Sequence, residues 1–221
     1  MTTSTAPAGP HRRAPRPRAD ALRNRERIVT AAREMFVEFG VQAPLDEIAR
    51  RAGVGNATLY RNFPERADLV HEVVLSLTAR VTERAREAAE QESDPFAALR
   101  RFTHAAADER VGALCPMLGG DFDKDHPELL AERERLEEAV HGLVVRAKQA
   151  GRMRADVGVG DLMVALFQLT RPLPGTACPT MDRFVHRHLQ LFLDGLETPA
   201  RSVLPGAPAT LEELRRDACG A

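Results

Sequence analysis

The feature that most constrains the fold is a succession of short helical segments between Ile28 and Phe63. The first segment is amphipathic, because its apolar residues recur at i, i+3, i+4, i+7, i+8 and i+11: Ile28, Ala31, Ala32, Met35, Phe36 and Phe39. Gly40 follows at the position where glycine commonly ends a helix. We therefore predict a helix over residues 21–39.

Two shorter segments follow the first. A helix over residues 44–52 begins at Pro44, a favoured first-turn residue, and places Asp46 and Glu47 near the positive helix start. The sequence Gly53-Val54-Gly55 interrupts the periodicity, and a helix over residues 56–63 then runs into Pro64. Two short helices joined by a glycine-containing turn indicate a helix-turn-helix.

The rest of the chain is also helical in pattern, and no convincing alternating strand is present. Helices are predicted over residues 64–90, 95–107, 109–118, 127–150, 160–170 and 179–195. We expect an all-α fold of about nine helices in four parts. These are a disordered basic arm over 1–20, a three-helix domain over 21–66, a larger helical domain over 67–197 and a Pro/Ala-rich tail over 198–221.

Charge is distributed unevenly along the chain. The net charge of the 221 residues is −1, but residues 1–64 hold 11 arginines against 6 acidic residues, a local charge of +5. The remaining residues carry −6. The basic first part is therefore the part suited to a polyanion such as double-stranded DNA.

The N-terminal segment resembles the TetR family of transcriptional regulators in its core pattern, its turn and its aromatic third helix. The matching residues are Ile28 to Ala32, Phe36-x-x-Phe39-Gly40, Ile48-Ala49-x-x-Ala52-Gly53-Val54 and Thr58-Leu59-Tyr60-x-x-Phe63. The resemblance implies that 21–66 is a DNA-binding domain and that 67–197 binds a ligand and dimerises. It implies a homodimeric repressor that binds a palindromic DNA operator and is released by a small, mostly apolar effector. The alternative is a DNA-dependent structural or partner-binding protein without an effector.

Residues 56–63 form the predicted recognition helix, with Leu59 and Phe63 as its inward anchors. Its side chains suit a major groove: an amide can pair with adenine, a small methyl can approach thymine, and hydroxyls can reach phosphates. The resemblance implies that four positions face the groove and two hold phosphates. The groove-facing residues are Asn56, Ala57, Tyr60 and Asn62, and the phosphate-binding residues are Thr58 and Arg66.

Several of these positions have simpler interpretations. Asn56 could serve only as a helix N-cap, and Tyr60 only as an aromatic at the edge of the core. Arg16 and Arg18, in the N-terminal arm, are candidates for minor-groove contacts or members of a solvated tail. Ala43-Pro44 departs from the family pattern, in which a hydroxyl residue often caps the second helix and touches phosphate.

The segment 160–170 is apolar on almost every side and therefore needs cover all round. One side can pack within its own domain while the other meets a second copy of the chain in a four-helix interface. The predicted dimer residues are Leu166, Phe184, His188, Leu191 and Phe192. The alternative is that these residues are ordinary core of a monomer.

Apolar and soft side chains of the C-terminal domain are the candidates for an effector pocket. We name Phe102, Met117, Phe122, Met163 and Phe167, although such residues at helical spacing more often belong to a core.

No enzyme or metal motif is convincing in the sequence. Asp121-x-Asp123-x-Asp125 outlines a calcium loop but has His126 where the turn needs glycine. His186 and His188 point about 200° apart on a helix, and the three cysteines are far apart. We expect no catalytic residue, no metal and no cofactor. The chain has no secretory signal and no run of 18 apolar residues, so we expect a cytoplasmic protein with no membrane contact.

Overall fold

The computed structural model describes residues 17–114, 122–171, 182–200, 202–210 and 212–213. Within these ranges the chain forms nine helices and no strand beyond one isolated bridge, so the all-α prediction is confirmed. The helices are α1 (Pro17–Phe39), α2 (Leu45–Ala52), α3 (Asn56–Asn62), α4 (Arg66–Gln91), α5 (Pro95–Asp108), α6 (Val111–Leu114), α7 (Pro127–Gln149), α8 (Val159–Leu169) and α9 (Asp182–Leu196). No helix in these ranges is long and apolar enough to cross a membrane.

The helix ends follow from local chemistry. Gly40, which follows α1, has a φ of +77°, a conformation that glycine adopts without steric cost. At the start of α5, the side chain of Asp94 accepts a hydrogen bond of 2.7 Å from the backbone N–H of Ala97, and Pro95 occupies the first turn. These two ends lie where the sequence places them. The start of the first helix differs from the prediction, because α1 begins at Pro17 instead of residue 21.

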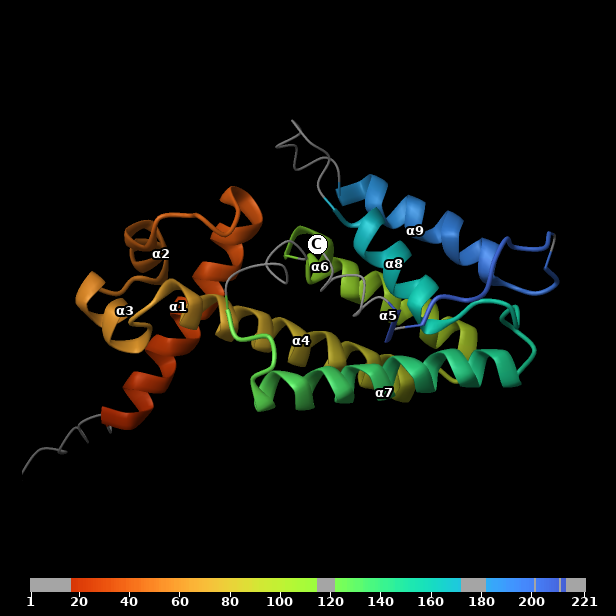
Figure 1. The fold of residues 1–221 in the computed structure, drawn as a ribbon, viewed down its shortest axis with the longest axis horizontal. Coiled ribbons are helices and arrows are strands. Elements are labelled where there is room, and N and C mark those ends of the chain that lie inside the picture. The colour runs from red at the N-terminus through yellow and green to blue at the C-terminus, as the bar shows by residue number, and fades with distance from the viewer. Residues whose placement is uncertain (1–16, 115–121, 172–181, 201, 211, 214–221) are drawn as a thin grey trace, which may run out of the picture.

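Helices α1 to α3 form a small domain at one end of the molecule (Figure 1). The long helix α4 leaves this domain and runs beside α7 into the larger domain, where it also packs against α5. Helices α8 and α9 pack against each other and against α5, on the side away from α4. Helix α4 is therefore the rigid connection between the two domains.

The two hydrophobic cores divide along α4. Val70 and Val74, in its first half, belong to the core of the small domain, whereas Val81 and Ala85 belong to the larger core. Leu129 of α7 also joins the small core. The core of the small domain thus extends beyond the boundary at residue 66 that the sequence suggested, because one face of α4 is needed to cover α1.

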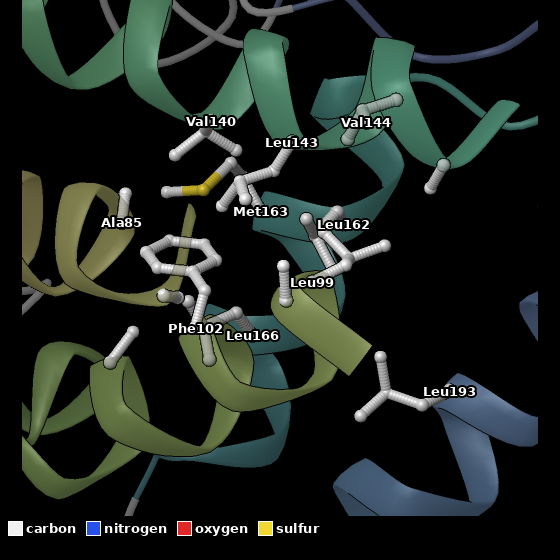
Figure 2. Close-up of a cluster of buried hydrophobic side chains, with 14 of the residues drawn as sticks. Ala85, Leu99, Phe102, Val140, Leu143, Val144, Leu162, Met163, Leu166 and Leu193 are labelled. Carbon is white, nitrogen blue, oxygen red and sulfur yellow. The ribbon is translucent and has the colours of Figure 1, made fainter. Parts of the chain in front are cut away.

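The larger core is built from α4, α5, α7, α8 and α9 (Figure 2). Phe102 and Leu99 from α5 lie in one cluster with Leu143 of α7 and Leu162 of α8, and all four are fully buried. A core of this kind holds the helices in one packed arrangement.

A buried carboxylate joins the two domains. Glu109, in the turn between α5 and α6, receives hydrogen bonds from Arg33 of α1 and from Arg80 and Arg84 of α4, at 2.7 to 3.1 Å. Its side chain is only 5% exposed. Because the three arginines come from α1 of the small domain and from the connecting helix α4, Glu109 links the orientation of the small domain to the turn after α5.

The described part of the C-terminal tail lies against the start of α8. The backbone N–H of Gly160 donates to the carbonyl of Ala209 at 3.1 Å, and the N–H of Ala209 donates to Asp161 at 3.1 Å. Gly160 allows this approach, since a Cβ there would lie 2.3 Å from the Ala209 oxygen. Residues 202–210 therefore form part of the C-terminal domain.

Candidate nucleic-acid interface

Helix α3 is held on the small domain by two buried side chains. Leu59 and Phe63 are each 1% exposed and belong to the core cluster that α1, α2 and α4 share. Their role as inward anchors, expected from the sequence, is confirmed. Because both anchors point inward, the opposite face of this short helix is turned to solvent.

Arg25 of α1 is a second anchor, which the sequence interpretation missed. Its guanidinium lies 4.4 Å from the centre of the Phe63 ring and donates to the carbonyl of Asn62 at 3.2 Å and to Glu72 of α4 at 2.6 Å. One side chain thus ties α1, the end of α3 and α4 together. Its partners are 37 and 47 residues away, so no local pattern could have indicated them.

The turn between α2 and α3 requires glycine. Gly53 has a φ of +64°, and its backbone N–H caps α2 by bonding the carbonyl of Arg50 at 3.1 Å. The guanidinium of Arg27 donates to the carbonyl of Gly53 at 3.0 Å and occupies the space that a Cβ would need. This turn sets the direction in which α3 leaves α2.

Three of the predicted groove-facing residues are exposed. Tyr60, the only tyrosine of the chain, is 47% exposed. Ala57 and Asn56 are also exposed. Gly55 is the N-cap of α3, so Asn56 does not act as the cap. Its side-chain amide donates to Asp46 of α2 at 2.9 Å, which orients the side chain at the start of the helix.

The remaining polar residues of α3 bond within the helix. The Asn62 amide donates to the carbonyl of Thr58 at 2.7 Å, and Arg61 donates to the carbonyl of Ala57 at 2.9 Å and to the Thr58 hydroxyl at 3.3 Å. Thr58 and Asn62 are half-buried. Their contacts with DNA remain a prediction.

Arg66 has a structural contact that the sequence did not reveal. Its guanidinium donates to the carbonyls of Val41 and Ala43, both at 2.8 Å, and the side chain is half-buried. These bonds hold the loop between α1 and α2 against the start of α4. A phosphate contact remains a prediction for its other N–H groups, and replacing Arg66 would disturb this loop as well.

The predicted DNA-binding arm is only partly described. Arg16 lies outside the described residues, and Arg18 belongs to the first turn of α1 instead of a disordered arm. Their contact with a minor groove remains a prediction.

Ion pairs neutralise some of the positive charge near the turn between α2 and α3. Arg51 of α2 donates to Glu38 of α1 at 2.7 and 3.0 Å, and this hydrogen bond lowers the pKa of Glu38. Arg50 pairs with Glu47 along α2, with its Nε at 2.8 Å from the carboxylate. The basic charge of residues 1–64 is therefore not all available to a polyanion.

The predicted dimer residues separate into two groups. Leu191 is 59% exposed and Phe184 37% exposed, and His188 and Phe192 are exposed or half-buried beside them on α9. The prediction that Leu166 lies at the dimer interface is corrected, because this residue is fully buried in the larger core and cannot meet a second chain. Val164, on the outer side of α8, is exposed instead. Val164, His188 and Phe192 border a shallow hollow between α8 and α9.

The predicted effector residues do not lie around one cavity in the described structure. Phe102 and Met163 are buried in the larger core, and Phe167 packs against it. Phe122 packs against the core of the small domain instead. Met117 lies outside the described residues. The prediction that Phe122 shares one pocket with the other residues is therefore corrected. Helical spacing alone cannot show which core a side chain enters.

Comparisons with known proteins agree with this architecture. A family model described as bacterial regulatory proteins, tetR family, matches residues 28–73, and one described as transcriptional regulator SbtR-like, C-terminal domain, matches residues 94–198. The HTH-type transcriptional regulator SAB2452 of Staphylococcus aureus is 41% identical over 58 residues. That match covers 26% of this chain, and the chain spans 31% of the length of that relative.

Solved structures extend the similarity over most of the chain. The TetR transcriptional regulator SCO0520 from Streptomyces coelicolor is 30% identical with a TM-score of 0.59, covering 80% of this chain and 99% of that one. The TetR transcription regulatory protein from Mycobacterium vanbaalenii is 31% identical with a TM-score of 0.57, covering 82% and 99%. LfrR from Mycobacterium smegmatis, solved with proflavine, shares the fold at 21% identity, with a TM-score of 0.57 and coverage of 83% and 99%.

An exposed recognition helix on a helix-turn-helix, joined to a larger helical domain, defines a DNA-binding transcriptional regulator. The chain belongs to the TetR family of these regulators. The family consists of transcriptional regulators that bind DNA and small molecules, typically as dimers.

Proposed function

We propose that the protein is a homodimeric repressor that binds a palindromic operator through α3 and is released by a small, mostly apolar effector. The observation that carries this proposal is the presence of two exposed surfaces on one molecule. One is the polar outer face of α3, with Tyr60 and Asn56, and the other is the apolar outer face of α8 and α9, with Val164 and Leu191. The first suits DNA and the second suits another copy of the chain.

A dimer is the arrangement that makes a seven-residue recognition helix useful. One such helix reads only a few base pairs, whereas two helices about 34 Å apart reach successive major grooves and read a two-fold site. The apolar outer face of α8 and α9 supports a two-fold interface of four helices, because each chain would contribute the same two helices and the same surface.

Replacing Leu191 by arginine is expected to convert the dimer to monomers. A charge at this apolar position would be buried without a partner in the interface, so we expect the dissociation constant to rise at least tenfold. Analytical ultracentrifugation measures it. Leu130→Arg is the matched control, because Leu130 is an exposed leucine on α7. A dimer of unchanged affinity in Leu191→Arg would contradict this interface.

Replacing Tyr60 by alanine is expected to weaken operator binding about tenfold, the cost of one lost base or phosphate contact. The fold should be unaffected because the side chain is half exposed. Fluorescence anisotropy with operator DNA gives the affinity, and a thermal melt tests the fold. Tyr60→Phe separates the hydroxyl from the ring. Wild-type affinity in both variants would show that α3 docks in another way.

Release by an effector is supported by the presence of methionine and phenylalanine side chains, such as Met163 and Phe102, in the core of the larger domain, since such side chains can repack around a small molecule. LfrR, which has the same fold, was solved in complex with proflavine, so a protein of this fold can hold a small molecule. An effector weakens DNA binding only as far as it prefers the conformation that does not fit the operator.

One experiment tests the proposed function as a whole. Genomic fragments bound by the purified protein are selected and sequenced, and a thermal-shift screen finds small molecules that stabilise it. We expect a two-fold sequence motif and at least one stabilising compound that lowers the affinity for it. Many unrelated fragments, or stabilising compounds that leave operator affinity unchanged, would favour a structural DNA-binding role.

A further inference from the structure

Two histidines and a carboxylate meet where α4 and α7 lie side by side. His71 comes from the second turn of α4, His126 is the N-cap of α7, and Glu128 lies in the first turn of α7. Each offers a ligand atom, and these atoms all lie within 4.8 Å of one another. The two imidazole rings are 4.6 Å apart, with their planes at 67°.

The polar atoms of this cluster are incompletely satisfied. The Nδ1 atom of His126 is buried and, among the described residues, has no hydrogen-bond partner. A buried ring nitrogen without a partner is uncommon in folded proteins. Phe122 covers one side, with its ring centre 6.2 Å from that of His71. The cluster is thus partly shielded from water, and within the described part of the chain it offers a ligating atom that no hydrogen bond occupies.

We propose that His71, His126 and Glu128 form a binding site for a divalent transition-metal ion, with zinc as its representative. Two imidazoles and one carboxylate are ligands that such ions prefer, and calcium and magnesium favour oxygen ligands alone. Tetrahedral zinc with bonds of about 2.1 Å places its ligand atoms about 3.4 Å apart. The three ligand atoms lie within 4.8 Å of one another, so the cluster needs at most a small contraction to reach this spacing.

Charge at the site makes Glu128 essential. The first turn of α7 presents the positive end of its helix, which disfavours a cation. The carboxylate of Glu128 offsets this effect and supplies one negative ligand. Three protein ligands leave a fourth position for water, as in zinc sites that remain open.

The position of the site connects it to the DNA-binding domain. Val70 and Val73, on either side of His71 in α4, belong to the core of the small domain, as does Leu129 beside Glu128. A metal ion held there would fix the start of α7 against α4 directly beside that core. The two histidines are 55 positions apart, so the sequence shows no metal-binding motif and we expected no metal.

Metal titration of the full-length protein tests the site. The chain is purified without a histidine tag, stripped with a chelator and titrated with zinc chloride by calorimetry, with magnesium chloride as a second titrant. We expect one zinc ion per chain and no saturable magnesium binding. His71→Ala, His126→Ala and Glu128→Gln should each weaken zinc binding at least tenfold. His141→Ala, an exposed histidine on α7, should not change it.

Two further measurements test whether the metal binds at this site and not at a cysteine. Cobalt(II) bound to the wild type should show visible absorption bands of a nitrogen and oxygen site, without the thiolate charge-transfer band that Cys115, Cys178 or Cys219 would give. At one zinc concentration, zinc should raise the melting midpoint of the wild type more than that of Glu128→Gln, because weaker binding stabilises the folded state less. This variant alters an exposed side chain and is expected to fold.

The proposal would be overturned by an absence of saturable zinc binding in the wild type. It would also be overturned by wild-type affinity in both histidine variants, or by a cobalt spectrum of thiolate type. No DNA enters these measurements, so their outcome is independent of the repressor function proposed above.

Discussion

Phe63→Ala is expected to lower the free energy of unfolding by about 3–5 kcal/mol and to abolish operator binding. Phe63 is 1% exposed, lies in the core that α1 to α4 share, and lies against the Arg25 guanidinium. Its removal leaves a cavity under α3 and takes away the ring on which Arg25 rests. Urea unfolding followed by circular dichroism measures the first effect, and operator binding by anisotropy the second.

The matched control is Phe39→Ala. Phe39 is the last residue of α1 but is 62% exposed, so its truncation removes little buried surface. We expect a change below about 0.5 kcal/mol and unaltered operator affinity. Equal losses in the two variants would mean that α3 does not depend on its buried anchor.

Glu109→Gln is expected to destabilise the protein by about 3 kcal/mol, the lower end of the range for breaking a buried ion pair. The carboxylate is 5% exposed and pairs with Arg33, Arg80 and Arg84. Its loss removes this counter-charge from Arg33 and Arg80, whereas Arg84 keeps its ion pair with Glu87 at 2.8 Å. The arginines keep 22 to 45% of their side chains exposed, and this solvent contact limits the loss. Glu83→Gln, an exposed glutamate on α4, is the control.

The same pair of variants predicts a pH dependence. Burial raises the pKa of Glu109, but its bonds to Arg80 and Arg84 and the charge of Arg33 lower it, and the net result lies below the ordinary value of 4.5. A carboxyl whose pKa is lowered on folding contributes stability above its unfolded pKa and loses it as the pH falls through its folded pKa. The stability difference between wild type and Glu109→Gln should therefore be constant from pH 7 to 5 and shrink at lower pH. A difference that grows in acid would contradict the assigned role.

The positions of the helices could be predicted because local chemistry sets them. Asp94 and Pro95 start α5, Gly40 ends α1, and Gly53 turns the chain between α2 and α3. Each of these effects acts within one or two turns of backbone, so the residues concerned are neighbours in the sequence.

The roles of polar side chains were less predictable. The sequence predicts a phosphate contact for Arg66, whereas in the structure its guanidinium donates to the carbonyls of Val41 and Ala43. Thr58 and Asn62 bond within α3, and Leu166 enters the core instead of the outer face of α8. An arginine or asparagine can serve several partners, and only the folded arrangement decides which partners are within reach.

The sequence by itself determined the helical class, the helix-turn-helix, its two inward anchors and the family, because apolar periodicity and glycine turns are local properties. Tertiary structure alone decided the Arg25 contacts across three helices, the Glu109 link between domains and the meeting of His71 with His126. These contacts join residues 25 to 76 positions apart. Such contacts depend on how whole helices pack, which the spacing of residues along the chain does not encode.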